Sequence, residues 1–122
     1  MAKESLKQRL DQLKDHSTLQ LTTLGRKTGK RHRVTVWYLV DGDTVYLVTQ
    51  GLKRDWPRNI MKNGHADLDI AGKAFKGHAK QITNAKQVSH VKALLNQKYW
   101  LAWVGSWFGM APEGAFAVTI EG

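Results

Sequence analysis

Short segments with alternating apolar and polar residues, rich in Val, Thr and aromatic side chains, recur along this chain and predict β-strands. Turn residues separate them, with Asp41-Gly42-Asp43 after the second segment and Gly72-Lys73 after the fourth. The first three strands are expected to form a meander and the next two a hairpin. The predicted strands are residues 18–23, 32–40, 44–49, 66–71, 74–83 and 115–121.

Three segments have helical spacing instead. Residues 3–15, within an N-terminal region of residues 1–16, place leucines on one side of an amphipathic helix that is expected to cap an open barrel end. A helix lying on a membrane surface is the alternative. Asp55 is predicted to cap a short helix with Pro57 in its first turn and Gly64 at its end. Asn84 is predicted to cap a third helix, whose apolar stripe is Val88, Val91, Leu94 and Leu95.

This order of elements favours an α+β, mainly β, fold: one mostly antiparallel split β-barrel with flanking helices over residues 1–122. The chain has no cysteine, no signal-peptide pattern and no segment of membrane-spanning length, so we expect a cytoplasmic protein, with peripheral contact at the inner face of the membrane left open. The five histidines lack metal-ligand spacing and an evident carboxylate partner, so no metal site is expected.

Nineteen Lys and Arg residues against ten Asp and Glu give a net charge of +9, which attracts polyanions of any kind. The charge is concentrated in residues 24–33, LGRKTGKRHR, where five cationic side chains and two glycines occupy a predicted hairpin tip. Such a tip can bind phosphate through charge-assisted hydrogen bonds. A solvated basic surface is the other interpretation, and the spacings of a P-loop or a dinucleotide fingerprint are absent.

The stretch LTTLGRKTGKRHRVTVWYLVDGDTVYLV resembles the LTTxGRKTGxPRxxPxxYxxDGDxxxxV motif of deazaflavin-dependent nitroreductases. The following GLKRDWPRNIMKNGHADLDIAGK is similar to the family segment in which a tryptophan and an asparagine open a helix, so the resemblance covers Leu19 to Lys73. It implies an FMN-binding-like split barrel that binds coenzyme F420 and passes hydride from its reduced form to an electrophilic acceptor such as a quinone, nitroaromatic or enone.

The resemblance also implies a set of cofactor-binding positions. Lys27 matches the family lysine at the cofactor phosphate, and His32 stands where the family has an arginine. The strand end at Thr49 lies where the family passes the cofactor ring, and the loop after it faces the acidic tail. Trp56 is also expected as a core anchor. The implied cofactor-binding residues are Arg26, Lys27, Arg31, His32, Arg33, Thr49, Gln50, Gly51, Lys53, Arg54, Trp56, Arg58 and Asn59.

The acceptor side is expected in the aromatic segment YWLAWVGSWFG and on the second strand, where Trp37 replaces a family tyrosine. Tyr99 is the candidate proton donor, and Trp37, Trp103 and Trp107 are the candidate walls for a small hydrophobic acceptor. An aromatic stripe of this kind is also typical of a core. Two other functions stay open: a barrel that binds FMN, and a binding protein without turnover for an apolar ligand or a polyanion. We do not expect nucleic acid, and the sequence leaves the oligomeric state undetermined.

Overall fold

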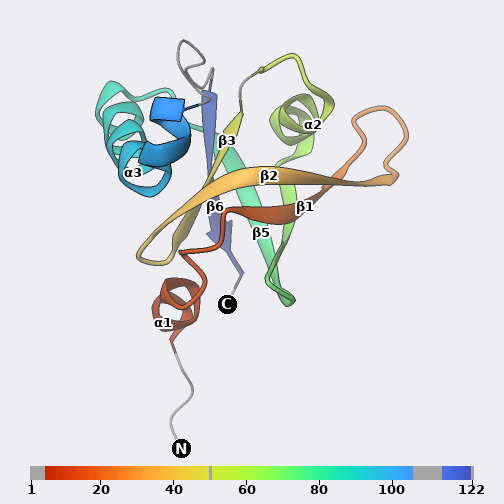
Figure 1. Cartoon of the computed structure of the whole chain (residues 1–122). Helices are drawn as coiled ribbons and strands as arrows, with labels where there is room; N and C mark the ends of the chain where they lie inside the picture. The colour runs from red at the N-terminus through yellow and green to blue at the C-terminus, as the bar shows by residue number, and fades with distance from the viewer. Residues whose placement is uncertain (1–4, 50, 106–113, 122) are drawn as a thin grey trace, which may run out of the picture.

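The computed structural model describes residues 5–49, 51–105 and 114–121, with side chains except over residues 99–105. The fold is a closed six-stranded barrel with three helices outside it (Figure 1). In chain order the elements are α1 (Leu6–Asp11), β1 (Thr18–Leu24), β2 (Arg31–Asp41), β3 (Thr44–Thr49), α2 (Asp55–Asn63), β4 (His65–Ile70), β5 (Lys73–Gln81), α3 (Ala85–Gly105) and β6 (Gly114–Ile120).

The strands follow the order β1-β2-β3-β6-β5-β4, and β4 pairs again with β1 to close the barrel. Every pairing is antiparallel, which confirms the predicted meander and second hairpin. The second turn is centred on Ala71 and Gly72, one residue earlier than predicted, and Lys73 already belongs to β5. The predicted split-barrel class is therefore confirmed.

The barrel interior is filled by every second residue of each strand, as the alternating pattern requires. Leu21 of β1, Tyr38 of β2, Leu47 of β3 and Phe116 of β6 are completely buried in this core. Burial of such side chains contributes about 1.5–3 kcal/mol each to folding, so the barrel is the stable frame on which the loops are held.

The N-terminal helix is shorter than predicted. Ser5 caps α1 through a capping box with Gln8, and the helix ends at Asp11 instead of Asp15. The Tyr38 hydroxyl donates a hydrogen bond to the carbonyl of Leu13, so this carbonyl is satisfied by the barrel and needs no further helical turn. The leucines do pack into the barrel core, which supports the predicted capping role.

Helix α2 begins one residue earlier than predicted, at the residue that was expected to be its cap. Arg54 is the N-cap and makes no side-chain capping bond, while Asp55 is the first helical residue and pairs with Arg26. Gly64 ends the helix with φ of 74°, as predicted. A Cβ at Gly64 would lie 2.2 Å from the His78 ring, so both the backbone angle and the neighbouring side chain favour glycine.

Helix α3 packs on the outside of the barrel through the predicted apolar stripe. Val91 and Leu95 are buried against Leu39 and Val48, and they form a second core cluster separate from the barrel interior. Asn84 caps the helix by accepting hydrogen bonds from the backbone N–H groups of Lys86 and Gln87 (2.9 and 3.3 Å). Among the described residues, no helix is both long enough and apolar enough to cross a membrane.

Candidate functional site

The β1–β2 hairpin extends past the barrel wall and ends in a compact basic tip (Figure 1). The Gly25 N–H donates to the Lys30 carbonyl (2.8 Å), and the Gly29 N–H donates to the Gly25 carbonyl (2.9 Å). Gly29 adopts φ of 72°, a left-handed angle that favours glycine. The glycines of the motif therefore belong to a hydrogen-bonded turn with a defined backbone conformation.

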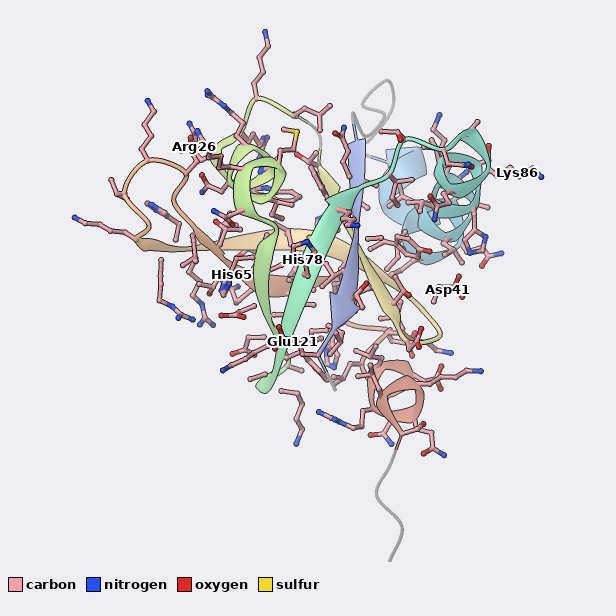
Figure 2. All side chains as sticks on the ribbon, turned by 180° about the vertical axis from the view of Figure 1, so that it is seen from behind. Arg26, Asp41, His65, His78, Lys86 and Glu121 are labelled. Atoms are coloured by element: carbon pink, nitrogen blue, oxygen red, sulfur yellow. The ribbon has the colours of Figure 1, made fainter. Side chains whose placement is uncertain are left out.

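The tip is tied to α2 through Arg26 and Asn59. The backbone N–H and the Nη1 of Arg26 both donate to Asn59 Oδ1, at 3.1 and 3.0 Å. The Asn59 amide donates in turn to Thr23 Oγ1 (3.2 Å), and Asp55 lies 3.4 Å from the Arg26 guanidinium. Figure 2 shows Arg26 on the side of the hairpin that faces α2. Both predicted residues thus connect two structural elements.

Asn63 adds a third connection, because its amide donates to the carbonyl of Leu24 (3.1 Å). Asp55, Asn59 and Asn63 are four residues apart and therefore lie on one face of α2. Asp55 was expected only as a helix cap, and no role was expected for Asn63. Their polar spacing of four residues was the signal that could have revealed this face.

A groove of about 540 Å³ opens between the hairpin and α2. His32, Arg33, Lys53 and Arg54 supply its basic groups, and the one carboxylate on its wall, Asp55, is already paired with Arg26. Such a donor set suits phosphate oxygens, which accept charge-assisted hydrogen bonds. The lining residues are Thr23, His32, Arg33, Val34, Lys53, Arg54, Asp55, Trp56 and Asn59.

A second hollow, of about 170 Å³, adjoins the groove and shares Arg54 and Trp56 with it. Trp56 is 6% exposed and its ring lies 5.6 Å from that of Phe116, so it is both a core anchor and a wall of the site. Thr49 Oγ1 donates to the Gly51 carbonyl (3.0 Å) and accepts from the Gly51 N–H (3.1 Å), which fixes the strand end. The lining residues are Thr35, Val36, Trp37, Val48, Thr49, Arg54 and Trp56.

A third hollow, of about 160 Å³, lies under α3 and shares Val48 with the second. Ile82, Val91 and Leu95 form its aliphatic wall, and Gln81 and Lys92 also line it. Trp37 packs against the same apolar cluster. The three hollows therefore adjoin one another, with basic side chains gathered in the first, Trp37 and Trp56 in the second, and an aliphatic wall in the third.

Not every predicted cofactor residue lines these hollows. Arg31 pairs with Asp67 (2.9 Å) on the outer barrel surface, and Arg33, which does line the groove, also pairs with Asp69 (3.5 Å). Lys27 is exposed at the hairpin tip and Arg58 is exposed on α2. Gly51 contributes to the strand end and lies outside the lining sets. The roles of these residues toward a cofactor stay predictions.

Several predicted residues lie outside the described part of the chain. Gln50 and Trp107 are not described, and Tyr99 and Trp103 belong to the backbone of α3 without described side chains. The proton-donor role of Tyr99 and the wall roles of Trp103 and Trp107 therefore stay predictions.

The histidines gave a different result from the sequence expectation. His65 pairs with Asp67 (3.0 Å) and His90 pairs with Asp41 (2.6 Å), so two of them do have carboxylate partners. These partners come from a neighbouring position on a strand and from a distant turn, and neither pattern stands out in the sequence. Within the described ranges, no three side chains of the metal-ligating types gather into a metal site.

Solved structures show the same fold in proteins of distant sequence. An F420-H2 dependent reductase, FDR-A, superposes with a TM-score of 0.67 at 17% identity, covering 88% of this chain and 96% of that one. A heme binding protein from Mycobacterium smegmatis gives 0.74 at 13% identity, with 99% and 53% covered. A FAD-binding protein from Mesorhizobium loti gives 0.66 at 13%, with 93% and 87% covered. No curated protein matches the sequence significantly.

The family assignment comes from the sequence itself. Residues 3–102 match the family model described as F420H(2)-dependent quinone reductase, which covers the barrel motif, α2 and most of α3. The match includes the basic hairpin and the Trp56 and Asn59 positions on which the resemblance was based, and it confirms coenzyme F420 as the cofactor. The chain therefore belongs to the F420H2-dependent quinone reductase family and is an F420-dependent oxidoreductase.

Proposed function

We propose that this chain reduces a quinone-type acceptor with F420H2, and that the basic groove between the hairpin and α2 holds the cofactor phosphate. The observation that carries the proposal is the series of three adjoining hollows, which offer a basic group of side chains, then two tryptophans, then an aliphatic wall. A cofactor with a flat ring and an anionic tail, together with an apolar acceptor, has this same order of chemical character. When bound, the deazaflavin supplies the hydride.

The groups of the chain divide into three tasks in this proposal. His32, Arg33 and Arg54 bind the phosphate, while Lys53 and the exposed Arg58 face the acidic tail. Trp56, Val36 and Val48 form a largely apolar wall against which the ring is oriented and from which water is excluded. The acceptor lies toward Trp37 and α3, beside the aliphatic wall.

The test is a titration of the purified protein with oxidised F420 and, in parallel, with FMN, followed by quenching of tryptophan fluorescence. Arg54→Gln removes the one cation shared by the two hollows, and we expect the Kd for F420 to rise roughly tenfold, or about 1.4 kcal/mol. Lys62→Gln removes the same charge from the far end of α2 and serves as the control.

Two results would contradict the proposal. Binding of FMN without binding of F420 would assign the groove to a flavin. An unchanged Kd for F420 in the Arg54 variant would separate the groove from the cofactor. If the variant behaves as expected, turnover with a soluble quinone and with a nitroaromatic compound then identifies the acceptor class.

A further inference from the structure

We propose that Arg26 and Asn59 are positioning residues that hold the two walls of the anion groove at a fixed separation. This inference rests on the proposed function, in which the groove takes the cofactor phosphate. It gives Arg26 a different role from the one that the family resemblance implies. In that resemblance Arg26 shares the charge of the phosphate site.

Arg26 makes its hydrogen bonds and its ion pair with other side chains of the protein. Its backbone N–H and Nη1 converge on one oxygen, Asn59 Oδ1, and its guanidinium is accompanied by the Asp55 carboxylate. The Arg26 side chain is 21% exposed. A cation that is already paired with a carboxylate adds little to the attraction of a further anion. Arg26 is therefore better suited to fix a geometry than to bind phosphate.

Asn59 occupies the buried end of the same network. It is 2% exposed, its oxygen accepts both bonds from Arg26, and its amide donates to Thr23, which is fully buried. A buried amide with its donor and acceptor both engaged is costly to rearrange, because each broken bond leaves a polar group without a partner. The network is thus anchored in the barrel at Thr23 and reaches the hairpin tip at Arg26.

The network joins two walls that carry different basic groups. His32 and Arg33 belong to β2 in the hairpin, whereas Lys53 and Arg54 directly precede α2. Phosphate contacts from both walls require a defined separation, since hydrogen bonds weaken beyond about 3.2 Å. The second hollow depends on Val36 and Val48 of the strands and on Trp56 of α2, whose ring is held in the barrel core against Phe116, and so it does not need the Arg26–Asn59 contact.

The inference predicts a selective effect on ligands that carry the phosphate. Arg26→Lys keeps the charge but loses the planar guanidinium that contacts both Asn59 and Asp55. Asn59→Ser keeps a small polar side chain, but this side chain is too short to contact Arg26. For each variant we expect the Kd for F420 to rise about tenfold, whereas the Kd for the deazaflavin chromophore without phosphate and tail stays within about twofold. In the double variant the loss should be about as large as in one single variant, because both act on one network.

The controls separate positioning from general damage. Lys62→Gln removes a charge from α2 outside the groove and should leave both Kd values unchanged. Thermal melts with far-UV circular dichroism show whether each variant is folded; should Asn59→Ser fail to fold, Arg26→Lys, on the partly exposed tip, still decides the question.

Each remaining outcome has a definite meaning. Equal weakening of both ligands, or no weakening of either, overturns the positioning role. Additive losses in the double variant overturn it as well, and assign Arg26 to direct phosphate contact. A wild-type protein that binds F420 no better than the phosphate-free chromophore contradicts the proposed function itself, so the two failures are distinguishable.

Discussion

Helices α2 and α3 both pack apolar side chains on the same barrel, and they differ in the contacts that dominate their attachment. Helix α2 is joined to the hairpin by side-chain hydrogen bonds from residues spaced four apart, with Asn59 at the centre. Helix α3 lies against β2 and β3 through an apolar stripe that includes Val91 and Leu95. Hydrogen bonds are directional and apolar contacts are not, so the two helices are held with different geometric precision.

This difference matches the hollows that each helix borders. Under the proposed function, the basic groove beside α2 contacts the oxygens of one phosphate, which requires donors at fixed positions. The hollow beneath α3 is lined by aliphatic side chains together with Gln81 and Lys92, and its aliphatic surface accommodates ligands of different shape. We infer that cofactor selectivity depends on the α2 side and that acceptor breadth depends on the α3 side.

The largest expected effect is on the α3 side, where Leu95 is 2% exposed. Leu95→Ala should lower the free energy of unfolding by about 2–5 kcal/mol, because it leaves a cavity, whereas Leu95→Met should cost less than about 1.5 kcal/mol. Urea denaturation followed by fluorescence measures both. Equal losses in the two variants would mean that α3 depends on exact side-chain shape and would remove the contrast with α2.

On the α2 side we expect a smaller loss of stability, and this loss should occur even when the substituted side chain has a similar volume. Asn59→Leu is similar in size, yet it removes the partner of the Arg26 N–H and of Thr23. It should lower the free energy of unfolding by about 1–3 kcal/mol. The same denaturation experiment applies, with Leu95→Met as the matched apolar substitution. A loss below that of Leu95→Met would show that the hydrogen bonds of α2 contribute no special constraint.

A pH-dependent effect tests the polar contact on α3. Lys98 donates to the Tyr38 carbonyl (3.0 Å), its ammonium lies 3.6 Å from the centre of the Tyr38 ring, and burial lowers the pKa of Lys98 to about 8 despite the nearby Asp15. Between about pH 8 and the ordinary value of 10.5, the unfolded chain retains a proton that the folded chain has released. The free energy of unfolding should therefore rise with pH in this window.

Tyr38 has the opposite influence at higher pH. Burial, with a further contribution from Asp15, raises its pKa from 10.0 to about 12, so the folded chain holds its proton more tightly and stability falls between these values.

The measurement that tests the lysine is urea denaturation from pH 7 to pH 10 for the wild type and Lys98→Met. The wild type should gain stability relative to the variant as the pH rises. Parallel curves would show that the lysine titrates alike in both states.

The periodic patterns of the sequence predicted most of the fold, and the reasons for the errors are physical. Val88, Val91 and Leu95 predicted the face of α3 correctly, because helical spacing alone decides which side chains share a face. The end of α1 was wrong because Tyr38, distant in sequence, takes up the Leu13 carbonyl. The cap of α2 was wrong because the Asp55 carboxylate has an arginine of the hairpin as its alternative partner.

The candidate site was predicted less completely than the fold. The basic motif and Trp56 pointed to residues that the fold brings together, since His32, Arg33, Lys53 and Arg54 line one groove. Arg31, in contrast, pairs with Asp67 on the outer surface of the barrel. A sequence gives the charge of an arginine but not the carboxylate that a neighbouring strand brings beside it, and the pairing of β1 with β4 decides that contact.

The sequence by itself determined the strand and helix faces, the excess positive charge and the family, because each is carried by local spacing, composition or a contiguous motif. The tertiary structure decided which charges face the groove, which are paired elsewhere, and that Arg26 and Asn59 connect its two walls. These choices depend on contacts between residues more than thirty positions apart. Such contacts arise when the barrel closes, because strand pairing sets distances that no local pattern encodes.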